Sequence, residues 1–251
     1  PFSTNNLSSF IQNIFLTQSI LSDTETWNTV SWSISTEFYT YIIFSLVCLF
    51  FNRSFLLIVC ASLLIVFYAF FSLIYEVVPI FSMNMTRCLL GFFIGVLIFN
   101  LSASPTQGLG EKFSFPSIVP YFALVLTILA IIYADWFGVY VTIIFGIFIF
   151  TLLNSSPLLE IKRLLSWQPL VYLGSISYGI YMIHPLIWFF IHNTLTYVFK
   201  YPLLETDQIV IGQSILANMI IIFGGFLVLI AAHLSYKYFE LPIMHKNQKQ
   251  K

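Results

Sequence analysis

An apolar stretch of helical length runs from Tyr172 to Trp188, with the sequence YLGSISYGIYMIHPLIW. In an α-helix its small, hydroxyl and imidazole side chains fall at steps of three and four and share one face. The residues on this face are Gly174, Ser177, Tyr181, His184 and Trp188. Pro185 has no N–H to donate to the Tyr181 carbonyl, so the helix is predicted to kink beside His184. An ionisable ring in hydrocarbon faces protein or a wet cavity. His184 is therefore either a functional residue or a neutral histidine satisfied by a neighbouring Tyr or Ser.

Two further ionisable residues fall inside apolar stretches. Glu37 lies in the segment SWSISTEFYTY, where helical spacing places it on one polar stripe. This stripe consists of Ser33, Thr36, Glu37, Thr40 and Tyr41. Arg87 shares a helix face with Gly91 and Gly95. GxxxG spacing by itself indicates close helix packing.

The helical rise gives the depth of these three side chains. Glu37 and Arg87 lie roughly 6 and 7 Å below the outer ends of their helices, and His184 roughly 12 Å below the surface of a core about 30 Å thick. One interpretation is a buried Glu37–Arg87 ion pair that holds two helices in register. The other is a polar pocket, open to the outer side, in which a carboxylate, a guanidinium and an imidazole converge on a ligand.

The composition is that of a polytopic membrane protein. Of 251 residues, 59% are hydrophobic and 8% charged, and the mean hydropathy is +0.93. Soluble chains are about 25% charged. Ten Lys and Arg balance ten Asp and Glu, so no basic field attracts nucleic acid, and we expect no nucleic-acid partner. The three cysteines lie in apolar runs without metal-ligand spacing, and we expect neither disulfides nor a metal.

Seven stretches approach the roughly 20 apolar residues that cross a bilayer, and they predict an all-α transmembrane helix bundle. They are Ser33–Phe51, Phe55–Ile74, Ser82–Phe99, Ile118–Tyr133, Phe137–Leu153, Val171–Phe199 and Ile209–Tyr236. The fourth and fifth are short, meet at Asp135-Trp136 and could form one hairpin. Before the bundle, residues 1–31 are predicted to be an outer loop or surface helix, with an amphipathic helix over Leu7–Leu21. Residues 237–251 are predicted to be a cytoplasmic tail.

The positions of the basic residues predict the orientation. With the N-terminus outside, the inner loops and tail hold eight of the ten Lys and Arg, Lys200 stays outside, and Arg87 lies within a span. Basic residues concentrate on the cytoplasmic side. We therefore expect residues 33–236 to form a bundle whose chain starts outside and ends in the cytoplasm.

Three passages resemble elements of the acyltransferase 3 family of integral membrane O-acyltransferases. Trp32–Tyr39, WSISTEFY, is similar to W-S-L-S-x-E-x-F-Y with one residue fewer between Glu and Phe. Leu173–Pro185 is similar to L-G-x-x-S-Y-x-x-Y-L-x-H, and Ser235–Pro242 to the S-Y-x-x-x-E-x-P that closes the last helix. Arg87 fits the family's arginine-containing middle helix more weakly.

The resemblance implies a ten-helix fold, of which this chain would hold about the last seven helices as one domain over residues 1–251. It also implies transfer of an acyl group, most often acetyl, from acyl-CoA to a hydroxyl of an extracytoplasmic glycan or lipid-linked sugar, in a bacterial inner membrane. The family's essential histidine belongs to the first helix, so we expect the 251-residue chain alone to insert but not to catalyse. His184 has no carboxylate beside it in sequence to set its tautomer, which makes it a poor substitute.

The resemblance also gives roles to individual residues. Glu37, Arg87 and His184 are expected to support catalysis, because acyl transfer needs proton acceptance and stabilisation of an oxyanion. Substrate contacts are expected from Trp32, Ser177, Tyr178 and Tyr181, and contacts to the phosphates of acyl-CoA from Lys162 and Arg163. Glu240 is expected to have a structural role, capping or pairing with a basic residue at the inner end of the last helix, and Pro185 is also expected to be structural.

Two other classes compete with this enzyme. A transporter or flippase could use a pocket of Glu37, Arg87 and His184 for substrate or protons. A sensor or scaffold would show no dependence on acyl-CoA. Consumption of acyl-CoA by the purified protein discriminates among the three.

Overall fold

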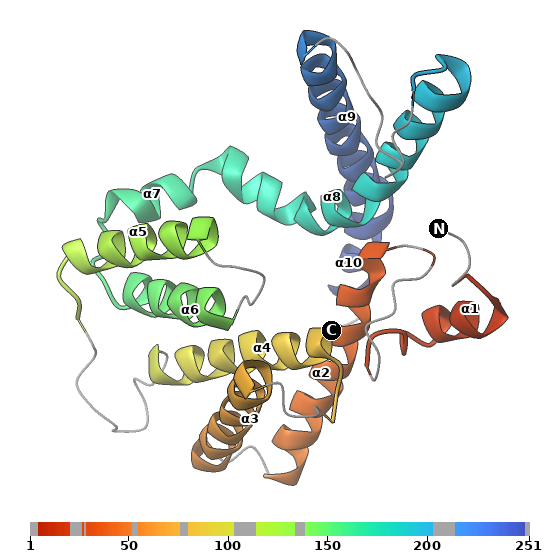
Figure 1. Ribbon diagram of the computed structural model, residues 1–251. Coiled ribbons are helices and arrows are strands. Elements are labelled where there is room, and N and C mark those ends of the chain that lie inside the picture. Colours follow the sequence, from red (N-terminus) through yellow and green to blue (C-terminus); the bar gives the residue numbers. More distant parts are fainter. Residues whose placement is uncertain are drawn as a thin grey trace. The chain divides into compact units, whose positions relative to one another are not determined.

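The computed structural model describes residues 5–20, 27, 29–51, 55–75, 80–102, 114–133, 139–202 and 214–248. In these residues the chain is helical, as predicted, with one isolated β-bridge between Phe115 and Ser155. It divides into two compact units, Pro1–Leu164 and Leu165–Lys251. We call them the N-terminal unit and the C-terminal unit, and Figure 1 shows their helices.

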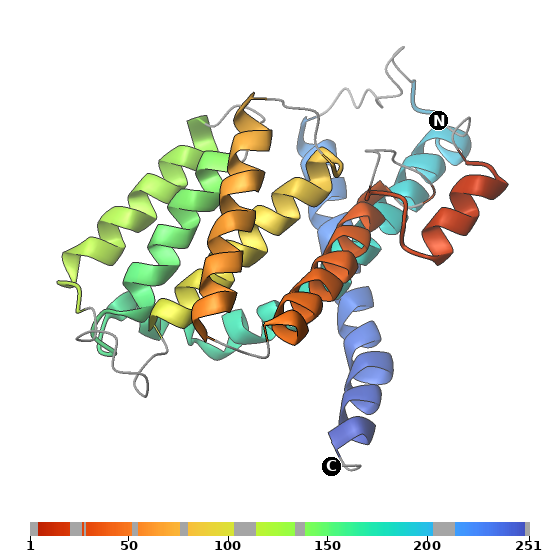
Figure 2. The ribbon, with the colours of Figure 1, turned by 90° about the horizontal axis from the view of Figure 1, so that it is seen from below.

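The N-terminal unit contains most of the predicted spans. Its helices are α1 (Leu7–Ile14), α2 (Trp32–Phe50), α3 (Phe55–Tyr75), α4 (Met83–Ser102), α5 (Ile118–Tyr133), α6 (Val139–Leu153) and, at the boundary, α7 (Glu160–Leu165). Short 3-10 turns at Thr29–Ser31 precede α2. The α2, α3 and α4 helices are long and apolar enough to cross a membrane, whereas α5 and α6 are shorter. The α5 and α6 helices pack side by side, as a hairpin requires (Figure 2); the Asp135-Trp136 connection lies outside the described residues.

The core of the N-terminal unit is centred on α4, which packs against α2, α3 and α6. Its Met85, Leu89 and Phe93 are buried against partly buried side chains of α2 and α3. On another face, Leu90 is buried with Ala69, Leu73 and Val139. Close approach to α6 rests on Gly146, where a Cβ atom would lie 2.7 Å from the Ile94 side chain. The helix that carries Arg87 is therefore fixed from three sides.

The predicted helix over Leu7–Leu21 is wrong in its second half, because α1 ends at Ile14. Leu16 has a φ of 56°, a left-handed conformation that cannot continue an α-helix. The residues that follow turn inward, and Gln18 and Ser19 are almost fully buried. Serine hydroxyls from α2 and from the start of α4 bind this segment: Ser35 donates to the Leu16 carbonyl at 2.6 Å, and Ser82 donates to the Ser19 carbonyl at 2.6 Å. Tertiary hydrogen bonds thus replace the helical ones.

The C-terminal unit is a helical hairpin of two long helices. The α8 helix (Gln168–Asn193) continues into a π-helical turn at Thr194–Val198. The α9 helix (Ser214–Ser235) continues through a second π-helical turn, Tyr236–Glu240, into α10 (Leu241–Gln248). Both long helices are apolar enough to span a membrane, and the predicted tail is helical as far as Gln248. Figure 1 shows that α8 is bent, as Pro185 within it predicts.

Small residues hold α8 and α9 together. A Cβ atom on Gly179 would lie 3.4 Å from the Cβ atom of Ala232. About two turns away, a Cβ atom on Gly224 would lie 2.7 Å from the Trp188 ring, so the indole packs onto the bare backbone of α9. Small residues at such crossings let helices in a membrane approach closely.

Candidate functional site

A buried polar seam joins the N-terminal halves of α2 and α4. Ser35, Thr36, Thr40 and Thr86 are almost completely buried there. The Cys88 thiol of α4 lies against this seam and accepts a hydrogen bond from the Thr40 hydroxyl at 3.4 Å. Satisfied hydroxyls cost little in an apolar interior. The seam therefore fixes the register of the two helices that carry the predicted Glu37 and Arg87.

Glu37 lies next to this seam, on an exposed edge of α2. The Tyr41 side chain, one turn further along the helix, interacts electrostatically with the Glu37 carboxylate. The Tyr41 ring in turn packs against Phe92 of α4, with ring centroids 5.6 Å apart. Trp32 is half-buried at the first position of the same helix. A carboxylate steadied by a tyrosine can accept hydrogen bonds or a proton from a ligand at this edge.

Arg87 is half-buried on α4, and its Nε atom is buried. It lies four residues after the start of α4, and Glu37 five residues after the start of α2. Both depths correspond to about 6 to 8 Å along the helices. The structure thus packs together the two helices that carry these residues; their depth in a membrane and an ion pair between them stay predictions.

His184 is half-buried on α8, and a backbone carbonyl of the same helix holds its ring. Its Nδ1 atom is 2.7 Å from the Tyr181 carbonyl oxygen, the carbonyl that Pro185 cannot bind. A carbonyl only accepts hydrogen bonds, so Nδ1 carries the proton. In the neutral ring Nε2 is then the unprotonated nitrogen. The tautomer is set by the backbone of α8 and needs no carboxylate.

The other α8 candidates lie at different positions around this histidine. The Tyr181 and His184 rings are 5.9 Å apart. Tyr178 is exposed, and Ser177, also exposed, donates to the Gly174 carbonyl at 2.8 Å. Trp188 lines the same groove as His184, between α8 and α9. Of the predicted polar face, the structure therefore directs His184 and Trp188 into the groove.

The two predicted acyl-CoA contacts lie on α7. The Lys162 ammonium donates to the Ser155 carbonyl at 2.8 Å and is half-buried, while Arg163 is exposed. Lys162 thus also tethers the loop between α6 and α7. Arg163 keeps its guanidinium in solvent.

Sequence reasoning missed a cluster near the end of α9. The Tyr172 hydroxyl is hydrogen-bonded to Nδ1 of His233, and the Tyr172 ring lies edge-on to Tyr236. Ser235 donates to a Glu240 carboxylate oxygen at 3.5 Å. Glu240, expected to cap or pair with a basic residue, is therefore held by a hydroxyl. A π-helix brings residues i and i+5 together, and Ser235 and Glu240 have this spacing. The spacing is the sequence signal for the contact between Ser235 and Glu240.

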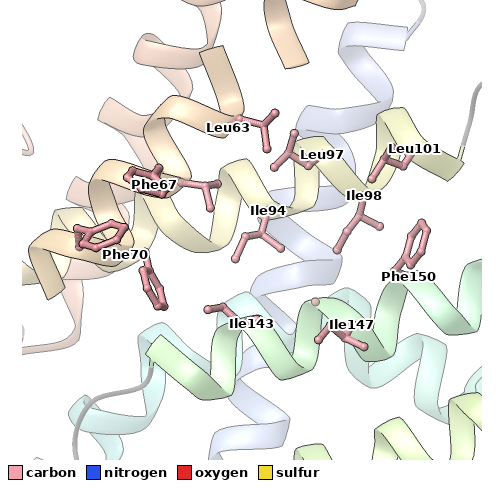
Figure 3. A pocket seen from close by; sticks show the side chains of 13 residues that line it. Leu63, Phe67, Phe70, Ile94, Leu97, Ile98, Leu101, Ile143, Ile147 and Phe150 are labelled. Atoms are coloured by element: carbon pink, nitrogen blue, oxygen red, sulfur yellow. The ribbon is translucent and has the colours of Figure 1, made fainter. Parts of the chain in front are cut away.

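A cavity of about 580 Å³ opens between α3, α4 and α6 (Figure 3). Its lining is entirely apolar and includes Phe67, Ile94 and Phe150. It offers no group for acid–base or nucleophilic chemistry. The polar candidates belong instead to the α2–α4 seam in the N-terminal unit and to the α8–α9 groove in the C-terminal unit. Their convergence in one cavity stays a prediction.

Comparison with known protein families gives a match over most of the chain. The model of the acyltransferase 3 family, described as an acyltransferase domain, matches residues 5–237. This range includes Glu37, Arg87 and His184. No curated protein matches the chain, and no solved structure matches it.

Proposed function

The chain belongs to the acyltransferase 3 family, and we propose that it transfers an acyl group, acetyl above all, from acyl-CoA to a hydroxyl of an extracytoplasmic glycan or lipid-linked sugar. Within the described residues, five helices are long and apolar enough to cross a membrane, which supports a multi-pass membrane protein. The observation that carries the proposal is the extent of the family match, which covers nearly the whole helical bundle.

The reaction we propose joins the acceptor oxygen to the thioester carbonyl carbon. The hydroxyl proton leaves to a base, the C–S bond breaks, and the CoA thiolate departs and takes up a proton. Stabilisation of the oxyanion and a positioned base are the main demands on the protein. Glu37 would orient the base or raise its basicity. Arg87 would hold Glu37 or bind an anionic group.

Acyl-CoA is a highly charged donor, and we assign its phosphates to the side of the membrane that carries α7. Guanidinium groups bind phosphate in a bidentate manner, and ammonium groups act as point charges. Arg163, with its exposed side chain, is the stronger candidate. We place this side in the cytoplasm because the loop charges favour it, and we propose a bacterial inner membrane from the family resemblance.

The experiment measures transfer of radiolabelled acetyl from acetyl-CoA to glycan and glycolipid fractions. Membranes from cells that express the complete gene are compared with membranes from a deletion strain. Label in a carbohydrate ester, released by mild alkali, is the expected result. Equal label in both strains would reject the proposed activity. Transport of the acceptor without acetyl transfer would favour a flippase.

A further inference from the structure

The geometry of α8 points to His184 as the residue that receives the acceptor hydroxyl, with Pro185 and the Tyr181 carbonyl as the groups that position it. This inference rests on the proposed function and names a binding site for its acceptor. Three facts carry it: a proline in the helix, a histidine bonded to the carbonyl that this proline leaves, and a groove beside the ring.

The first step is the missing backbone bond. In an uninterrupted helix the N–H of residue 185 donates to the carbonyl of residue 181. Pro185 has no N–H, and an unpaired carbonyl in an apolar span is costly. The His184 ring satisfies it at 2.7 Å. The Nδ1–H of His184 therefore has its acceptor within its own helix.

The second step is the consequence for the far side of the ring. With Nδ1 committed to its own helix, Nε2 is a hydrogen-bond acceptor and cannot donate in the neutral ring. A ligand that meets Nε2 must therefore bring a donor. A hydroxyl fits this requirement, whereas a thioester carbonyl does not.

The third step is the shape and lining of the groove. It has a volume of about 570 Å³ and lies between α8 and α9 within the C-terminal unit. Its other lining residues are Ile180, Trp188, Ile222, Gly225, Phe226, Val228 and Leu229. One acceptor nitrogen in an apolar groove suits a ligand that carries both a donor hydroxyl and a hydrocarbon tail. Among the two acceptors proposed above, this selects the lipid-linked sugar over the free glycan.

The test starts from the tautomer, which can be read without any turnover. The full protein is labelled with ¹⁵N-histidine in nanodiscs, and His184→Asn identifies the His184 signals among the four histidines. We expect a protonated Nδ1 and an unprotonated Nε2. Pro185→Ala restores an N–H for the Tyr181 carbonyl, and the protonated Nε2 tautomer should then appear. Protonated Nε2 in the unaltered protein would overturn the inference.

Ligand chemistry is tested with simple probes. 1-Octanol and octyl glucoside should shift the Nε2 signal, because each brings a hydroxyl and a hydrocarbon tail. Octyl methyl ether, which lacks the donor, and glucose, which lacks the tail, should not. A shift with the ether, or an equal shift with glucose, would contradict the assigned ligand class.

Two side chains then separate the roles of the two ring nitrogens. Asn at position 184 can still donate to the Tyr181 carbonyl but presents no acceptor at the position of Nε2. His184→Asn should raise the KM for the acceptor about three- to tenfold, the value of one hydrogen bond, with a smaller change in kcat. In His184→Gln the longer amide reaches the position of Nε2, so the KM for the acceptor should lie between the values of His184→Asn and the unaltered protein. Normal transfer with an unchanged KM in His184→Asn refutes this inference and leaves the proposed function standing. Absent transfer beside the expected tautomer and probe shifts refutes the proposed function, and with it the acceptor role of a hydroxyl site that would still exist at Nε2.

Discussion

Gly179 of α8 lies directly against Ala232 of α9, where an added Cβ atom would be 3.4 Å from the Ala232 Cβ atom and 3.5 Å from its Cα atom. We predict that Gly179→Leu separates the two helices and lowers the free energy of unfolding by about 1 to 3 kcal/mol, the usual cost of overpacking. Thermal unfolding in detergent measures it. Gly174→Leu is the matched control, because a Cβ atom there has nothing within 4 Å. Equal melting temperatures for the two variants would show that the hairpin does not depend on this crossing.

Two adjacent glycines of α9 should respond in opposite ways. Gly224 faces the Trp188 ring, so Gly224→Leu should lower the melting temperature. Gly225 has nothing within 4 Å of an added Cβ atom but lines the α8–α9 groove. Gly225→Leu should keep the melting temperature and raise the KM for the acceptor, because its side chain enters the groove. A stable Gly225→Leu with unchanged kinetics would mean that the acceptor binds elsewhere.

Ser82 has two roles at the start of α4, since its hydroxyl donates to the Ser19 carbonyl and accepts from the Met85 N–H at 3.1 Å. Ser82→Ala should cost about 1 to 3 kcal/mol of unfolding free energy, because a buried carbonyl and a helix N–H both lose partners. Chemical unfolding in mixed micelles measures the change. Ser45→Ala is the control: its exposed hydroxyl donates only to the Tyr41 carbonyl of its own helix, and its loss should change little.

Glu37→Gln keeps the shape of the side chain and removes its charge. We predict that it abolishes acyl transfer while leaving the amount of protein in the membrane unchanged. Glu160→Gln on α7 is the matched control, since Glu160 is an exposed glutamate of the same unit outside the spans. Acyl transfer is measured in membranes that contain equal amounts of the Glu37→Gln and Glu160→Gln variants. Full activity in Glu37→Gln would leave this residue only a role in helix pairing.

The two basic residues of α7 should separate binding from stability. Arg163→Ala should raise the KM for acyl-CoA up to about fivefold, as expected for an exposed ion pair, without changing the melting temperature. Lys162→Ala should also lower the melting temperature, because it breaks the bond to the Ser155 carbonyl. Kinetics at varied acyl-CoA and a melting curve distinguish these effects. An unchanged KM in both variants would place the phosphates elsewhere.

The positions of the long helices could be predicted from the sequence because apolar length is a local property. The predicted span Ser33–Phe51 corresponds to α2 at Trp32–Phe50, and Ile118–Tyr133 matches α5 at both ends. The break at Leu16 could not be predicted in this way. No residue type at that position favours a positive φ, and the serines that bind the segment come from later helices.

In the candidate site, too, contacts within one helix could be predicted from the sequence, whereas contacts between helices could not. Pro185 predicts that the Tyr181 carbonyl loses its usual helical N–H donor, because both residues belong to one helical turn, and the structure adds the His184 ring nitrogen that binds this carbonyl. The contact between Tyr172 and His233 joins residues 61 positions apart. Neither residue stands in a local pattern that indicates the other. Distant pairs of this kind depend on how α8 and α9 cross, which hydropathy and spacing leave undetermined.

The bond between Ser82 and Ser19 also has a meaning for synthesis. The two residues are 63 positions apart, and a chain leaves the ribosome from its N-terminal end. While α2 and α3 enter the bilayer, the Ser82 hydroxyl is not yet available to the Ser19 carbonyl. The segment from Phe15 to Ile20 therefore cannot yet reach its buried, hydrogen-bonded conformation. Packing of this segment therefore requires the synthesis of α4. A nascent chain arrested before Ser82 should leave the segment accessible to added protease.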